Sequence, residues 1–201
     1  FPRNDLPNAK PVALLTLPPL GDLLYGARPG GIGETCIILI VVAGLYLVYR
    51  NFVKWQLPFA MLAGAWLAAA IGPIFLAGPN ETVETWWLPF FSPQLAGQLE
   101  WDIRLQAGFT YVNYQLFCGE LFLAAFFLAP EMTSRPVTTG GQVLFGLIAG
   151  ALGMVLQLYL QTPIPFYLAV LAMNTFTPTI DAIWQPRVFG DKHFAFLRRN
   201  R

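Results

Sequence analysis

The sequence predicts an all-α integral membrane protein with about five transmembrane helices. No Asp, Glu, Lys or Arg occurs between Pro136 and Ile180, nor between Trp55 and Asn80. A helix of about 20 apolar residues spans the ~30 Å hydrocarbon core of a bilayer. Of the 201 residues, 56% are hydrophobic and only 11% are charged, whereas soluble proteins carry about 25% charged residues.

Three segments are expected. Residues 1–31 are rich in Pro and Gly and form an extracytoplasmic segment, residues 32–184 form the transmembrane domain, and residues 185–201 form a basic cytoplasmic tail. The five spans are expected at about Ile32–Tyr49, Gln56–Ala77, Tyr114–Ala129, Gly140–Leu160 and Phe166–Trp184, with an aromatic and acidic loop at 80–113.

Each span has its own sequence support. Arg50 and Lys54 end the first apolar run. The second contains many Ala and Gly residues, which favour close helix packing, and Pro73 bends or ends it. The third contains Glu120, the fourth has Gly146 and Gly150 at the spacing of a helix contact, and prolines separate the fourth from the fifth.

Loop charges predict the orientation. Arg50, Lys54, Arg135 and the basic tail fall on one side, which the excess of positive charge in cytoplasmic loops identifies as cytoplasmic. The N-terminus and the 80–113 loop are then outside. We expect a multi-pass protein of a bacterial inner membrane, surrounded by lipids and by other membrane subunits.

The composition argues against several classes of protein. The net charge of +1 does not favour nucleic-acid binding. Cys36 and Cys118 lie in apolar runs and are too few for an iron–sulfur cluster held by this chain. His193 is the only histidine, so the chain cannot supply two axial ligands to a haem.

The glycine-rich start of the first span is the first candidate site. Gly31, Gly33, Glu34 and Thr35 lie where this helix begins. They are compatible with an ordinary helix start, in which an acidic side chain complements the dipole. They are equally compatible with an anion or flavin-phosphate site, because a helix N-terminus presents free N–H groups.

A second candidate site is a set of polar residues within the spans. Glu120 is either a hydrogen-bonded residue near a helix end or part of an ion path. In the fifth span, Asn174 and Thr177 either satisfy the backbone around Pro178 or line a discontinuous helix. Asp181 belongs to the same path or pairs with Arg187.

Three motifs resemble the membrane flavin subunits of Rnf electron-transport complexes and of sodium-pumping NADH:quinone reductases, which are lettered D and B respectively. Residues 29–36, PGGIGETC, resemble the family's PGSIGETS. Residues 123–138, LAAFFLAPEMTSRPVT, are similar to LGAFFMATDPVTSPVT, and residues 171–190, LAMNTFTPTIDAIWQPRVFG, to LLMNxLTPLIDRxTxPRxYG. Glu120 and Arg135 depart from the family, which has small residues there.

The resemblance implies a fold and a cofactor. The family's fold is akin to urea transporters, with two five-helix repeats of inverted topology, and this chain resembles the second repeat. The family carries FMN on a Thr of a Ser-Gly-Ala-Thr motif, or binds riboflavin, and Thr16 stands near the expected position. Thr16, Gly31, Gly33, Glu34, Thr35 and Asn174 are the implied flavin-binding residues.

Two functions remain open. The first is a transmembrane subunit of an electron-transport complex, at most non-catalytic or electron-transferring, that helps couple redox chemistry to ion movement through Glu120, Thr177 and Asp181. The second is a cofactor-free scaffold subunit of a larger respiratory or photosynthetic complex. A channel or transporter rests on fold analogy alone.

The residues before Thr16 generate a first prediction. Ala13, Leu14 and Leu15 replace the family's small, flexible Ser-Gly-Ala, so an attaching enzyme would lack its recognition sequence. We expect the intact mass of the chain to show no phosphoester-linked flavin. A flavin adduct that disappears in Thr16→Ala would contradict this expectation.

Overall fold

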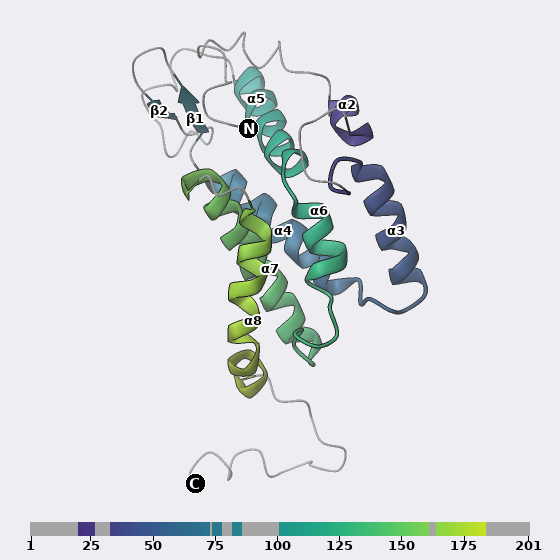
Figure 1. Ribbon diagram of the computed structural model, residues 1–201. Helices are drawn as coiled ribbons and strands as arrows, with labels where there is room; N and C mark the ends of the chain where they lie inside the picture. The colour runs from purple at the N-terminus through teal and green to yellow at the C-terminus, as the bar shows by residue number, and fades with distance from the viewer. Residues whose placement is uncertain are drawn as a thin grey trace, which may run out of the picture.

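A computed structural model describes residues 20–26, 33–72, 74–77, 82–85, 101–160 and 164–183. The elements are α2 (Leu20–Tyr25), α3 (Ile37–Tyr49), α4 (Gln56–Ile71), β1 (Ile74–Ala77), β2 (Thr82–Thr85), α5 (Trp101–Cys118), α6 (Leu121–Leu123), η2 (Ala124–Leu128), α7 (Thr139–Val155), η3 (Leu156–Leu160) and α8 (Pro165–Ile183). Both η segments are π-helical turns. Figure 1 shows α3 beside α6, and α8 in front of α4 and α7.

Two expected helix boundaries were wrong, and the backbone explains both. The first span begins at Ile37 rather than Ile32, because Gly33 has a φ of 89°, which belongs to no right-handed helix. The second span ends at Ile71 rather than Ala77. Gly72 is extended, with a ψ of 151°, as expected for the residue before a proline, here Pro73.

The segment expected as a loop at 80–113 contains one strand of a short hairpin and most of a helix, while the fold as a whole is helical as expected. Strand β1 pairs antiparallel with β2, with Ile74 opposite Thr85. Three of the four residues in Thr82–Thr85 are β-branched, which suits a strand. Helix α5 begins at Trp101, so the helical part of the third span starts well before Tyr114.

The third span is broken where an unbroken helix was expected. The segments Phe109–Phe117 and Leu121–Leu128 meet at 66°. Gly119 and Glu120 form the break. A Cβ at Gly119 would lie 3.0 Å from the Phe166 ring and 3.1 Å from Oε1 of Gln157. The break thus brings the α5–α6 chain close to η3 and α8.

Five apolar helical segments lie in the expected order, but they differ in length. Among the described residues, Thr139–Leu160 and Pro165–Ile183 are long and apolar enough to cross a bilayer, and the bent α5–α6 pair makes a third if it counts as one span. Ile37–Tyr49 and Gln56–Ile71 are shorter apolar helices. A predominantly helical membrane protein is therefore confirmed.

Helices α4 and α7 pack with their backbones almost in contact. A Cβ at Gly150 would overlap the carbonyl oxygen of Met61, and one at Gly64 would overlap that of Leu147. A Cβ at Gly146 would lie 2.9 Å from the Leu57 carbonyl oxygen. The small residues of both helices thus make the close approach that the sequence predicted.

These contacts also fix the helix directions. Early residues of α4 meet early residues of α7, so the two helices run parallel. Gly153, late in α7, packs on Phe166 at the start of α8, so α7 and α8 run antiparallel. Glu34, before α3, lies near Glu120, before α6, and Gly44 further along α3 packs on Phe126, so α3 runs with the third span. The two directions alternate along the chain as the loop charges predicted.

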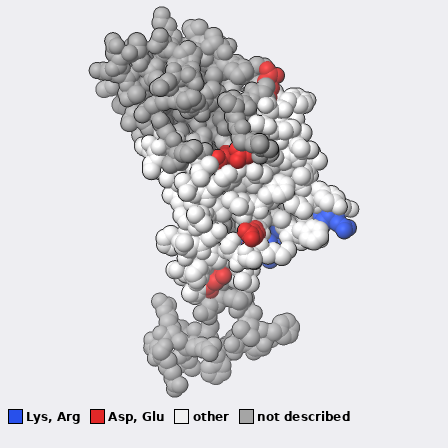
Figure 2. Space-filling model, viewed as in Figure 1, with Lys and Arg blue, Asp and Glu red and all other residues white. Residues whose placement is uncertain are grey.

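Charge is scarce over the described surface. Figure 2 shows a broad white area crossed by a few isolated red and blue groups, with the blue groups in its lower half. The positive side chains described there are Arg50 and Lys54 between α3 and α4, and Arg135 before α7. They lie at the end of the molecule where α4 and α7 begin.

The α4–α7 contact predicts the effect of adding one methyl group. Gly150→Ala should destabilise the protein by about 1–3 kcal/mol, because the overlap with the Met61 carbonyl forces backbone shifts. The thermal unfolding midpoint in detergent measures the change. Gly21→Ala is the matched control, since a Cβ there meets nothing within 4 Å. Equal midpoints for both variants would contradict the prediction.

Candidate functional site

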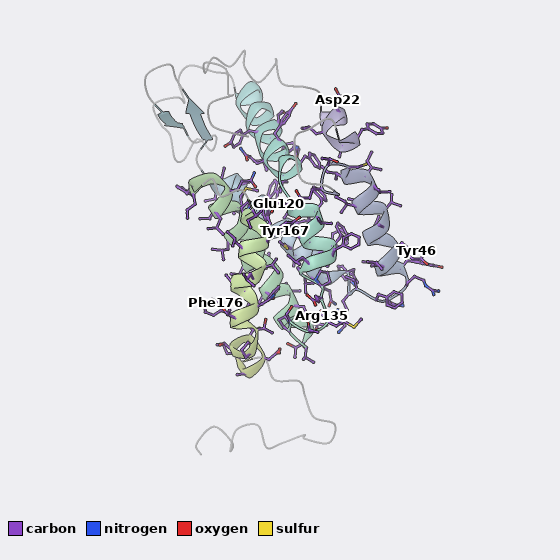
Figure 3. All side chains as sticks on the ribbon, viewed as in Figure 1. Asp22, Tyr46, Glu120, Arg135, Tyr167 and Phe176 are labelled. Atoms are coloured by element: carbon purple, nitrogen blue, oxygen red, sulfur yellow. The ribbon has the colours of Figure 1, made fainter. Side chains whose placement is uncertain are left out.

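Three polar side chains from distant parts of the chain meet at one end of the helices. The hydroxyl of Tyr167, in the first turns of α8, donates a hydrogen bond to Oε1 of Glu34, which precedes α3. Glu120, in the α5–α6 break, interacts electrostatically with both. Figure 3 shows Glu120 and Tyr167 next to each other, far from Arg135. We call Glu34, Glu120 and Tyr167 the carboxylate cluster.

Glu120 is the most deeply buried acid of the carboxylate cluster. Its side chain is 8% exposed, and its Oε2 atom has no hydrogen-bond partner. Glu34 is close enough for the two carboxylates to repel each other. A buried carboxylate without a partner is costly, so this oxygen requires an explanation.

Two glutamines extend the polar surroundings of the break. Nε2 of Gln157 in η3 donates to the carbonyl oxygen of Gln115 at 3.2 Å and to its Oε1 at 2.9 Å. Oε1 of Gln157 is buried without a hydrogen-bond partner and faces the Gly119 side of the break. The break is therefore bordered by two oxygen atoms that lack a donor.

Helix α8 continues through Pro178, which is not the site of a discontinuous helix. It runs unbroken from Pro165 to Ile183. The hydroxyl of Thr177 donates to the Met173 carbonyl at 3.4 Å, and that of Thr175 donates to the Ala172 carbonyl at 2.6 Å. Threonine hydroxyls thus bind the backbone near Pro178. The discontinuity occurs instead at Glu120.

A polar stripe follows one face of α8. Tyr167, Asn174 and Asp181 recur every seven residues, two helical turns apart, and all three are half-buried. Oδ1 of Asn174 is buried without a hydrogen-bond partner. By the helical rise, the stripe extends about 21 Å from the carboxylate cluster to the opposite end of α8.

The expected ion-path residues are spread along this helix. Glu120 lies beside Tyr167, whereas Thr177 is buried three turns further along α8. Asp181 accepts a hydrogen bond of 3.1 Å from the Val137 amide and so ties the end of α8 to the loop before α7. Its alternative partner Arg187 lies outside the described residues.

The expected flavin-binding residues are only partly covered by the described structure. Thr16 and Gly31 lie outside the described residues, whereas Gly33 is exposed and Thr35 is half-buried. Glu34 turns its carboxylate toward Tyr167 of α8. Asn174 is seven residues beyond Tyr167, so it does not join these residues.

Sequence reasoning missed Tyr167 and Gln157. Both are polar residues in otherwise apolar helices, and Tyr167 lies two turns before Asn174 on the same face. That spacing was the available signal. Gln157 offered only its rarity in the fourth span, because its contact with Gln115 depends on the break.

The hydrogen bond of the carboxylate cluster predicts a stability change. Tyr167→Phe should lower stability by about 1.5–3 kcal/mol, because it removes a donor to a charged group. Thermal unfolding in detergent measures the loss. Tyr46→Phe is the control, since Tyr46 is 60% exposed on α3. An unchanged midpoint for Tyr167→Phe would contradict a contribution of this bond.

Known proteins resemble the chain over nearly its whole length. The family described as NQR2, RnfD, RnfE matches residues 4–190. One relative is the subunit lettered D of the proton-translocating ferredoxin:NAD(+) oxidoreductase complex of Clostridium ljungdahlii. It is 30% identical over 174 residues, which cover 85% of this chain and 43% of the relative.

Two further relatives, also lettered D in their complexes, match this chain to a similar extent. That of the Na(+)-translocating ferredoxin:NAD(+) oxidoreductase complex of Acetobacterium woodii is 27% identical over 94% of this chain and 51% of its own length. That of the ion-translocating oxidoreductase complex of Halorhodospira halophila is 29% identical over 83% of this chain and 39% of its own length. The chain thus spans about half or less of these relatives. The match over residues 4–190 shows that the chain belongs to the NQR2, RnfD, RnfE family.

Proposed function

We propose that the chain is a transmembrane subunit of a membrane electron-transport complex that couples redox chemistry to ion translocation. The family match over residues 4–190 carries the proposal. The relatives are named as subunits of complexes that translocate protons, sodium or ions. An intramembrane carboxylate facing a second carboxylate supports an ion-handling role, because such groups are rare in apolar helices.

The ion path follows α8 in this proposal. Glu120 and the carboxylate cluster lie at its beginning, Thr177 lies within its second half, and Asp181 lies near its end. The half-buried stripe with Asn174 gives a polar line between the two ends. Side chains at this spacing supply oxygen atoms through the apolar layer, where a charge otherwise finds no partner.

The arrangement in the membrane follows from the charges. Arg50, Lys54 and Arg135 lie at one end, which we propose is cytoplasmic in a bacterial inner membrane, with the N-terminus outside and the C-terminus inside. The carboxylate cluster then lies toward the outer side. The five-helix repeat of the urea-transporter-like fold belongs to this proposal, with other membrane subunits as partners.

FMN or riboflavin is the cofactor that the family implies. Such a group would supply one-electron and two-electron chemistry, but Ala13, Leu14 and Leu15 replace the family's attachment sequence before Thr16. The proposal therefore assigns it no step. The missing Ser-Gly-Ala before Thr16 favours the second candidate, a cofactor-free scaffold that contributes helices to the complex.

Association with redox partners is the test of the proposed function. A C-terminally tagged chain, purified in mild detergent from its own host's membranes, should bring other membrane subunits and a flavin or iron–sulfur absorption spectrum. A tagged membrane protein of unrelated family from the same membranes is the control. Purification as a lone, well-folded chain would contradict the proposal.

A further inference from the structure

The break between α5 and α6 combines several sources of negative charge. Helix α5 ends at Cys118 directly before the break, and the C-terminal end of a helix carries a partial negative charge. Glu120 lies within the break and is 8% exposed. Glu34 adds a second carboxylate next to it. The described positive side chains Arg50, Lys54 and Arg135 belong to the opposite end.

Two buried oxygens at the break lack a hydrogen-bond donor. Within the described part of the chain, neither Oε2 of Glu120 nor Oε1 of Gln157 has a hydrogen-bond partner. A Cβ at Gly119 would lie 3.1 Å from this Gln157 oxygen, which places it at the break. Buried acceptors of this kind are normally satisfied. Both atoms are hydrogen-bond acceptors, and a proton on Glu120 or a bound cation would satisfy them.

The charge balance indicates one positive charge rather than two. Tyr167 already donates to Glu34 and stabilises its negative charge, which leaves the free oxygen of Glu120 to be compensated. The described part of the chain contains no group of three or more acidic, Cys or His side chains suited to a metal ion. Divalent cations such as calcium use six to eight oxygens.

We propose that Glu120 and Glu34 share one exchangeable monovalent cation, a proton or a sodium ion, at the α5–α6 break. Oε1 of Gln157 and the Tyr167 hydroxyl border the bound charge. The proposal deepens the proposed function, since it places an ion-binding site on that path. Release of the cation leaves the Glu120 carboxylate, at the 66° bend, repelled by that of Glu34, which precedes α3, so occupancy changes the force that acts on the bend.

Dicyclohexylcarbodiimide tests the site in the complex within native membranes. The reagent adds to a protonated carboxyl group in apolar surroundings: the carboxyl oxygen bonds to its central carbon and the proton moves to one nitrogen. Peptide mass spectrometry then finds the whole mass of the reagent on the modified residue. We expect labelling of Glu120 that rises as the pH falls from 9 to 6, because the reagent reacts with the protonated form.

Sodium distinguishes the two cations. If added sodium chloride slows the labelling of Glu120 and choline chloride does not, the site binds sodium in competition with the proton. If both salts act alike, the site holds a proton. Glu34→Gln should reduce labelling at neutral pH several-fold, because removal of the neighbouring charge weakens the attraction for a cation. Glu131→Gln, an exposed acid at the other end, should leave it unchanged.

Thermal unfolding provides a second measurement that does not depend on access of the reagent. The wild-type midpoint should depend on pH or sodium in a way that Glu120→Gln abolishes. Absence of both the labelling and this dependence would overturn the proposal. Labelling in a chain without redox partners would reject only the proposed function, and partners without labelling or dependence would reject only the cation site.

Discussion

The close approach of α4 and α7 is the constraint on which the rest of the structure depends. Their backbones meet at Gly64, Gly146 and Gly150, where any larger residue would overlap a carbonyl group. Helices in lipid gain no hydrophobic free energy from association, so such contacts supply dispersion and exclude lipid. The other helices pack around this closely spaced parallel pair. Helix α8 packs on one member of it through Gly153 and Phe166.

The residues of the carboxylate cluster depend on the α4–α7 pair for their positions. Because α7 holds Phe166 at the start of α8, the next residue, Tyr167, reaches Glu34 before α3. The same aromatic ring borders Gly119 and so limits where the third span can pass. The contact between Gly153 and Phe166 therefore positions the Tyr167 hydroxyl. The break next to it places Glu120 near both Tyr167 and Glu34.

The sequence predicted the apolar segments, their order and their relative directions, because length without charge and loop charge depend only on local composition. It also predicted the glycine contact in the fourth span. It failed where tertiary contacts decide. Pro178 indicates a helix break more strongly than Gly119 does, yet α8 continues through Pro178 and the third span breaks at Gly119. The segment that forms the start of α5 was predicted to be a loop because it contains the charged residues Asp102 and Arg104.

The candidate site was predictable only in part. Glu120 stood out as an acid in an apolar span, and Glu34 stood out within a glycine-rich motif. Their proximity could not be predicted from the sequence, because they lie 86 positions apart (120 − 34) and come together only through the folding of the α5–α6 break against the start of α3. Tyr167 could have been found from its two-turn spacing to Asn174, since both interrupt the same apolar helix.

The short helices α3 and α4 have a consequence for the surrounding lipid. Their 13 and 16 residues correspond to lengths of about 20 and 24 Å, less than the ~30 Å of an average hydrocarbon core. Hydrophobic mismatch of this kind is relieved when the bilayer thins locally or flanking residues extend to the interface. Lipids with shorter acyl chains would therefore gather beside α3, and membrane thickness becomes a variable that acts on this protein.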